Sequence, residues 1–210
     1  GNTRVPAESD VSIRPGWFWK EHENDDVKSL RHLLNIYYES VGRNSLLLLN
    51  VPPDTRGLIH EADSTRLMEF RAALDEIFSV NLVAGAQIEA ENVRGGSSRF
   101  SADNMLNDEY DSYWASDDDV TTVSFTVTLP EQKTFNLVQL QEYIPLGQRV
   151  SAFTIEVLNE DGTWKQVAEE NTIGYKRQDV VIADFERIFK EMRDELPLDN
   201  HTKDAAKFLA

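Results

Sequence analysis

The sequence contains no cysteine, which excludes a disulfide framework, a thiolate nucleophile and a cysteine-based zinc site. Basic residues are also scarce: 21 lysines and arginines stand against 37 aspartates and glutamates, and the formal net charge is -16 at pH 7. Such a charge repels nucleic-acid phosphates and anionic lipid surfaces, so neither partner is expected. Long apolar runs are missing too. The longest, LLLLNV, is far too short to cross a bilayer, and nothing near the first residue reads as a signal peptide.

What is present in the first part of the chain is an alternation of short apolar runs with amphipathic stretches. Strands are expected at 11–13 and at 45–49, the second being the continuous run SLLLL. Between them, apolar residues recur at steps of three and four from Val27 to Val41, which predicts a helix that stops at Gly42.

The stretch NVPPDTRG then breaks the chain, because consecutive prolines exclude helix. Asp63 is expected to cap a second helix, whose apolar stripe runs from Leu67 to Phe78. The resulting order of strand, helix, strand and helix predicts βα units with a parallel sheet.

The middle of the chain changes to a period of two. Val123, Phe125 and Val127 alternate with polar residues, as in a strand with one buried face. Further strands fit 135–143 and 151–158, and NEDG reads as a hairpin turn. This section therefore predicts an all-β sandwich. Past Lys176 the composition becomes helical again, in ADFERIFKEMRDEL and NHTKDAAKFLA.

Two segments resemble known families. PAESDVSIRPGWFW and SVGRNSLLLLNVPPDTRGLI are similar to the C-terminal end of the catalytic barrel of glycoside hydrolase family 29. This family comprises the α-L-fucosidases, and the resemblance is to the branch that acts on α-1,3 and α-1,4 linked fucose. It runs from about Val5 to Ser79. Residues 84–176, with NMLNDEYDSYWASDDDVTTVSFTV, resemble the discoidin-like (factor 5/8 type C) β-sandwich that follows the barrel in these enzymes.

The resemblance implies a multi-domain α/β plus all-β architecture. Residues 1–83 are expected to be the last βα units of a TIM-type (β/α)8 barrel, and 84–176 an incomplete galactose-binding-like β-sandwich of jelly-roll type. Residues 177–210 are expected to be a helical tail of unmatched origin. Because a closed barrel needs about 250 residues, the sequence is expected to be part of a longer enzyme or the product of a truncated or rearranged gene.

The implied activity is release of L-fucose from glycans by a retaining mechanism, which uses one carboxylate as nucleophile and a second as acid/base. The nucleophilic aspartate belongs to the missing strands, so the chain alone is expected to be inactive. The implied partners are a fucosylated oligosaccharide or glycoconjugate and the missing N-terminal barrel portion, and the intact enzyme is expected to be periplasmic or secreted. Two alternatives stay open: a non-catalytic carbohydrate-binding β-sandwich and an inactive remnant.

Within the barrel segment, the resemblance makes Glu8 a candidate acid/base, although a structural carboxylate paired with Arg14 explains it as well. Trp17, Phe18 and Arg14 are candidate substrate-binding residues, with plain barrel packing as the alternative for Trp17. A 6-deoxy sugar offers a methyl group and a C–H face, which rigid aromatic side chains can cover.

Within the sandwich segment, Tyr143 and Arg149 are candidates for a glycan contact or an interdomain contact. No cofactor is expected to be required. A structural calcium could be held by Asp103, Asp108 and Asp111, whose carboxylates are hard oxygen ligands, but a solvated acidic turn explains the same residues.

Overall fold

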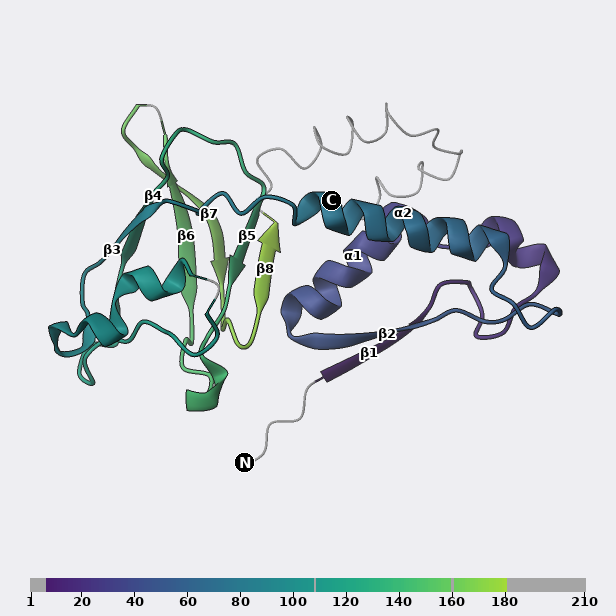
Figure 1. Cartoon of the computed structure of the whole chain (residues 1–210), viewed down its shortest axis with the longest axis horizontal. Helices are drawn as coiled ribbons and strands as arrows, with labels where there is room; N and C mark the ends of the chain where they lie inside the picture. Colours follow the sequence, from purple (N-terminus) through teal and green to yellow (C-terminus); the bar gives the residue numbers. More distant parts are fainter. Residues whose placement is uncertain (1–6, 108, 160, 181–210) are drawn as a thin grey trace.

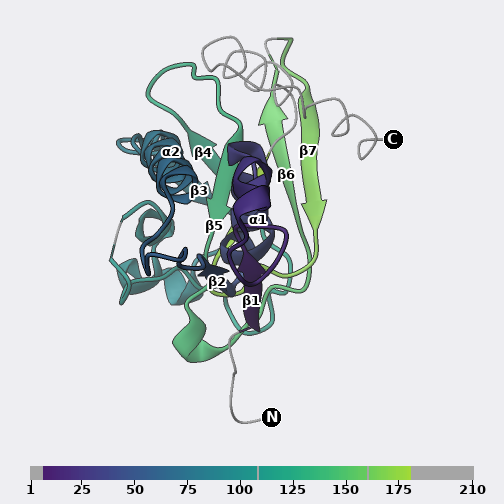
Figure 2. The same ribbon diagram turned by 90° about the vertical axis from the view of Figure 1, so that its right-hand side faces the viewer.

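The computed structural model describes residues 7–107, 109–159 and 161–180. It contains an α/β segment, residues 7–78, and a β segment, residues 87–180, which lie side by side in Figure 1. In the view of Figure 2, turned by 90°, the α/β segment lies in front of the β segment. The expected order of an α/β part followed by an all-β part is confirmed at this level.

The α/β segment is built on two parallel strands, β1 (Ala7–Ser12) and β2 (Ser45–Asn50). Their register places Ser12 opposite Asn50, so both strands end at the same edge of the sheet. The strand expected at 11–13 therefore begins earlier than its apolar residues suggested, because backbone pairing with β2 extends through the polar residues before Val11. The β2 side chains of Leu46 and Leu48 are 60% and 50% exposed.

Two helices, α1 (Leu30–Ser40) and α2 (Glu61–Ile77), lie on one side of this sheet (Figure 1). Two short 3-10 helices flank α1 in the chain: η1 (Glu21–Asp26) precedes it and η2 (Val41–Arg43) follows it. None of the helices in the described part of the chain has the length and apolar character needed to span a bilayer.

The starts of both helices differ from the sequence-based expectation. The first helix begins after Ser29, whose side chain accepts a hydrogen bond from the His32 N–H, and Val27 is in extended backbone. The second is capped by the His60 side chain, which accepts from the Ala62 N–H. The expectation that Asp63 is the cap was wrong, because its buried carboxylate pairs with Arg14 instead.

A small apolar core joins α1 to α2. Leu30 and Leu34 from α1 are buried against Ala73 of α2. Four half-buried side chains complete this cluster: Tyr38, Phe70, Leu74 and Ile77. The three- and four-residue spacing that predicted the helices therefore also predicted the faces that meet.

Together with short 3-10 helices, the described part of the β segment contains three antiparallel strand pairs. They are β3 (Gln87–Ala90) with β4 (Phe125–Thr128), β5 (Leu137–Leu140) with β8 (Arg177–Val180), and β6 (Phe153–Leu158) with β7 (Trp164–Glu170). β6 and β7 pair antiparallel from Leu158 and Trp164 onward, as the hairpin expected at NEDG requires.

Two expectations for this segment need correction. Residues 177–180, expected to begin a helical tail, form strand β8, because their backbone pairs with β5. The rest of that tail lies outside the described residues. Phe125 and Val127 were expected to be buried, yet they are 38% and 43% exposed, since β4 pairs with β3 alone in a two-stranded sheet.

Candidate functional site

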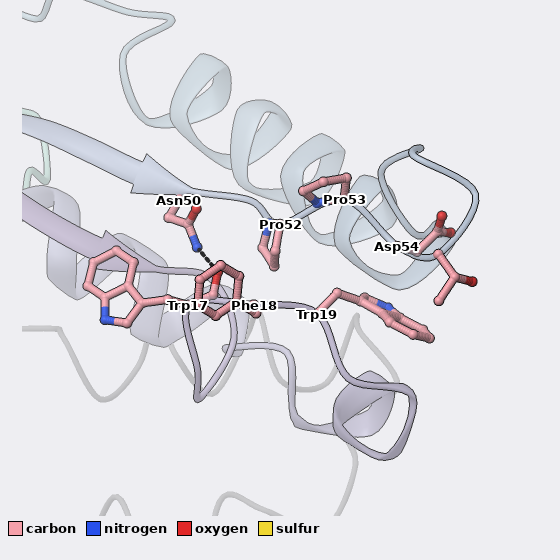
Figure 3. A pocket seen from close by; sticks show the side chains of 8 residues that line it. Trp17, Phe18, Trp19, Asn50, Pro52, Pro53 and Asp54 are labelled. Carbon is pink, nitrogen blue, oxygen red and sulfur yellow. Dashed lines mark hydrogen bonds between the residues drawn. The ribbon is translucent and has the colours of Figure 1, made fainter.

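A pocket of about 330 Å³ opens at the carboxyl ends of β1 and β2. Its walls come from the segment after β1 and the segment after β2, which face one another in Figure 3. Eight residues line it: Trp17, Phe18, Trp19, Asn50, Pro52, Pro53, Asp54 and Thr55.

The aromatic wall is fixed by hydrogen bonds at the ends of the two strands. The Ile13 N–H donates to the Asn50 carbonyl at 2.9 Å, which continues the ladder beyond β1. The Asn50 Nδ2 donates to the Trp17 carbonyl at 3.0 Å and to Ser12 Oγ at 3.1 Å. Trp17 and Phe18 are nevertheless 51% and 81% exposed. Rigid backbone with exposed aromatic rings is typical of a binding surface.

Arg14 supports this wall from beneath. Its side chain and that of Asp63 are both fully buried, and the Arg14 Nε lies 3.0 and 2.9 Å from the two Asp63 carboxylate oxygens. The Arg14 Nη2 also donates to Asn24 Oδ1 at 3.0 Å. Arg14 therefore ties the end of β1 to α2 and is not among the residues that line the pocket.

The opposite wall is a tight turn organised by Asp54. Its Oδ1 accepts from the backbone N–H of Arg56 at 2.8 Å, and its Oδ2 accepts from Arg56 Nε and Nη2 at 2.8 and 2.6 Å. These hydrogen bonds from the Arg56 side chain lower the pKa of Asp54 below its ordinary value of 3.8. Asp54 is thus a carboxylate at neutral pH and cannot donate a proton to a leaving group.

The lining residues fit a small polar molecule with an apolar face. Three aromatic rings and two prolines supply flat apolar walls, while Asn50, Asp54 and Thr55 supply polar atoms. Asp54 alone among the eight lining residues can ionise. The two carboxylates that glycoside hydrolysis requires are therefore not both in this pocket.

Of the residues singled out from the sequence, Trp17 and Phe18 line the pocket, whereas Arg14 and Glu8 do not. Glu8 is exposed near the start of β1, opposite Leu46. It precedes Ser12 by four residues, which is roughly 13 Å along an extended strand. The alternative of a Glu8–Arg14 pair is wrong, because Arg14 pairs with Asp63.

In the β segment, Tyr143 stacks on Tyr113 with ring centroids 4.4 Å apart and planes 12° from parallel. The Arg149 Nε donates to the Leu146 carbonyl at 3.3 Å. Both side chains thus make contacts within their own segment.

For the calcium prediction, Asp103 is exposed and its Oδ2 accepts from Ser101 Oγ at 2.9 Å, Asp111 is exposed, and Asp108 lies outside the described residues. In the described part of the chain, no group of three or more histidine, aspartate or glutamate side chains could hold a metal ion. With Asp108 undescribed, calcium binding stays a prediction.

The sequence reasoning missed Trp19, Asn50 and the turn from Pro52 to Thr55 as pocket residues. The signal that could have found them was the parallel sheet itself, since parallel strands end at one edge and bring the segments that follow them together. NVPPDT follows one expected strand as RPGWFW follows the other.

Comparison with known proteins agrees with this division of the chain. The sequence model of the alpha-L-fucosidase family matches residues 2–75, and that of the F5/8 type C domain matches residues 87–191. Alpha-L-fucosidase 1 of Arabidopsis thaliana is 42% identical over 179 residues, 84% of this chain and 35% of that protein. A relative from Oryza sativa subsp. japonica is 46% identical over 179 residues, and the match covers 34% of that protein.

Among solved structures, the GH29 fucosidase E1_10125 of Ruminococcus gnavus, in complex with fucose, is similar with a TM-score of 0.77 and 36% identity. The similarity covers 82% of this chain and 35% of that one. The chain spans about a third of the length of the curated relatives it matches. The resemblance drawn from the sequence is confirmed by both family models: the alpha-L-fucosidase model matches residues 2–75, and through half of its length the chain belongs to the F5/8 type C domain family.

Proposed function

We propose that this chain supplies one wall of the fucose-binding pocket of an α-L-fucosidase, a retaining glycosidase, and that it releases no fucose without the rest of that enzyme. The observation that carries the proposal is the pocket at the carboxyl ends of two parallel strands, with Trp17, Phe18 and Trp19 in its wall. Active sites of (β/α)8 barrels lie at that edge. The methyl group and C–H face of a fucosyl residue match flat apolar walls.

We assign β1, α1, β2 and α2 to the last βα units of such a barrel, and the β segment to a galactose-binding-like jelly roll. Parallel sheets are normally covered on both faces. The exposure of Leu46 and Leu48 supports the assignment, because the remaining strands of a barrel would cover them. Exposed Glu8 and Asp10 pair in register with these two leucines and so share their face, which would be the barrel interior.

We keep Glu8 as the acid/base candidate on this basis. Acid/base catalysis requires a carboxyl group within hydrogen-bond reach of the leaving-group oxygen, and the interior face of a barrel strand can present one to the substrate. The partner nucleophile must come from outside this chain.

The test grafts residues 7–180 into the Arabidopsis thaliana relative in place of the matching region and measures fucose release from an aryl α-L-fucoside. The graft should be active, and the 210-residue chain alone should not be. In the graft, Glu8→Gln should lower kcat by about 10²–10⁴-fold, whereas Glu39→Gln, on the surface of α1, should have no effect. Fucose release by the chain alone, or a folded but inactive graft, would contradict the proposal.

A second measurement tests the proposal if the graft does not fold. Saturation-transfer NMR on the unaltered chain should show contact with the methyl group of methyl α-L-fucoside, and Trp17→Ala should abolish it. The absence of transfer at millimolar sugar would count against a fucose wall.

A further inference from the structure

The turn between α1 and β2 is the place where the α/β segment meets the β segment. The helix η2 and Asn44 lie against residues 173–178, which lead into β8 and begin it. In Figure 1, β8 is the strand of the β segment beside this turn.

Asn44 binds the backbone of the other segment with both atoms of its amide. Its Nδ2 donates to the Ile173 carbonyl at 3.0 Å, and its Oδ1 accepts from the Lys176 N–H. Asn44 has a φ of 69°, in the left-handed region that asparagine tolerates better than most residues. This backbone conformation and the side-chain hydrogen bonds occur at one residue, directly before β2 begins.

Gly42 permits the close approach. A Cβ added at Gly42 would lie 3.2 Å from Gln178 Oε1 and 3.3 Å from Gln178 Cβ. Gln178 is only 4% exposed, and its Nε2 donates to Gln139 Oε1 at 2.8 Å. Because Gln178 is held by its neighbour on β5, it has little room to retreat from a larger residue at position 42.

The β segment holds the same loop from its other side. The Glu142 Oε2 accepts from the Gly174 N–H at 2.7 Å, and the Glu142 N–H donates to the Gly174 carbonyl at 2.9 Å. The other carboxylate oxygen of Glu142 accepts from the backbone of Arg149 and Val150 at 2.6 and 2.9 Å. Residues 173–176 are therefore anchored to both segments at once.

We infer that Gly42 and Asn44 form a docking notch for residues 173–178, through which the β segment fixes the start of β2 and so positions Asn50 at the pocket. Asn44 precedes β2 directly, and Asn50 is the last residue of β2 and holds the Trp17 carbonyl. Asn44 touches nothing in the pocket and is a positioning residue. The inference concerns the coupling of the two segments and does not depend on which sugar the pocket takes.

The first test is hydrogen–deuterium exchange of the full 210-residue chain. Asn44→Gly keeps the left-handed backbone accessible but removes both hydrogen bonds. Exchange should become about tenfold faster in residues 45–50 and in residues 173–178, and should stay unchanged in the β6–β7 hairpin. Asn44→Asp keeps the acceptor for Lys176 and should have a smaller effect. Asn35→Ala, on the exposed face of α1, is the control.

Faster exchange in residues 173–178 alone would overturn the inference, because the notch would then not position β2. Unchanged exchange in both regions would overturn it as well.

A double-mutant cycle tests the contact independently. Gly42→Ala should lower the Tm in the native background, since its methyl group collides with Gln178. In a Gln178→Gly background the same change should have little effect, because the colliding atoms are gone. If the Tm shifts of the two changes simply add, Gly42 and Gln178 do not contact each other and the notch is wrong.

Discussion

Arg14 comes shortly before the exposed Trp17 in the sequence, yet its guanidinium group is buried in the protein interior. It forms a buried pair with Asp63, and Lys28 Nζ donates to the Arg14 carbonyl at 3.1 Å. Breaking such a pair at one end leaves a charge in a place that water cannot reach, which costs far more than the intact pair contributes. Arg14 therefore matters to the pocket through the backbone that follows it.

Asp63→Asn should accordingly lower the free energy of unfolding by about 3–5 kcal/mol, since Arg14 would remain charged and buried. Asp75→Asn is the matched control on the same helix. Its carboxylate pairs with Arg71 on the surface, where solvent screens the interaction, and the change should be much smaller. Urea unfolding followed by circular dichroism measures both. Equal effects of the two substitutions would contradict the argument that the Arg14–Asp63 pair matters to stability because it is buried.

The pKa of Asp54 predicts how the turn responds to acid. Because Arg56 lowers this pKa in the folded chain, Asp54 contributes stability that is present above its ordinary value of 3.8 and is lost as the pH falls through the lower folded value. Asp54→Asn should therefore be less stable than the native chain at pH 6, and the difference should shrink toward pH 2. Asn35→Ala, at an exposed position on α1, removes no ionisable group and is the control whose difference from the native chain should not change with pH.

At the same scale, the aromatic candidates that the family resemblance supplied, Trp17 and Phe18, line the pocket, whereas Arg14 does not. Arg14 was assigned to substrate because its burial depends on Asp63, which lies 49 positions away in the chain. Asn50 was overlooked because its hydrogen bond to Trp17 exists only in one register of β1 and β2.

At the scale of elements, the α/β segment depends on the contact between α1 and α2. Leu34→Ala removes a side chain that is 3% exposed and should destabilise the chain by about 2–5 kcal/mol. Met68→Ala on α2 is the comparison, because Met68 is 70% exposed and should cost little. Thermal unfolding of both variants measures the difference. A large loss of stability in the Met68 variant would mean that the outer face of α2 is also covered.

The helices were predictable because an apolar period repeats over many residues in each, and β2 was predictable because its apolar run is continuous. β3 and β8 were missed for the opposite reason. Each is four residues long, and a period of two cannot be distinguished from chance over so short a run. What makes them strands is pairing with β4 and β5, which are distant in sequence.

At the scale of the whole molecule, the parallel arrangement of β1 and β2 followed from the order of elements, but the contact between the two segments did not. The part of that contact described above involves the Asn44 amide and Gly42, and neither residue type indicates a distant partner in the sequence. Tyr143 and Arg149, which were considered for that contact, make the contacts described above inside the β segment.

The sequence separations of the hydrogen bonds around the pocket also determine when it can form. Trp17 is held by a residue 33 positions later, and Arg14 by one 49 positions later. The entropy cost of closing a loop grows slowly with its length, by about 0.6 kcal/mol for each doubling. These separations therefore do not prevent the contacts from forming once both residues of each pair have been synthesised. During synthesis, however, a nascent chain that ends before Asp63 carries both walls of the pocket but no counter-charge for Arg14. The aromatic wall that follows Arg14 is therefore fixed only after the first turn of α2 has been synthesised.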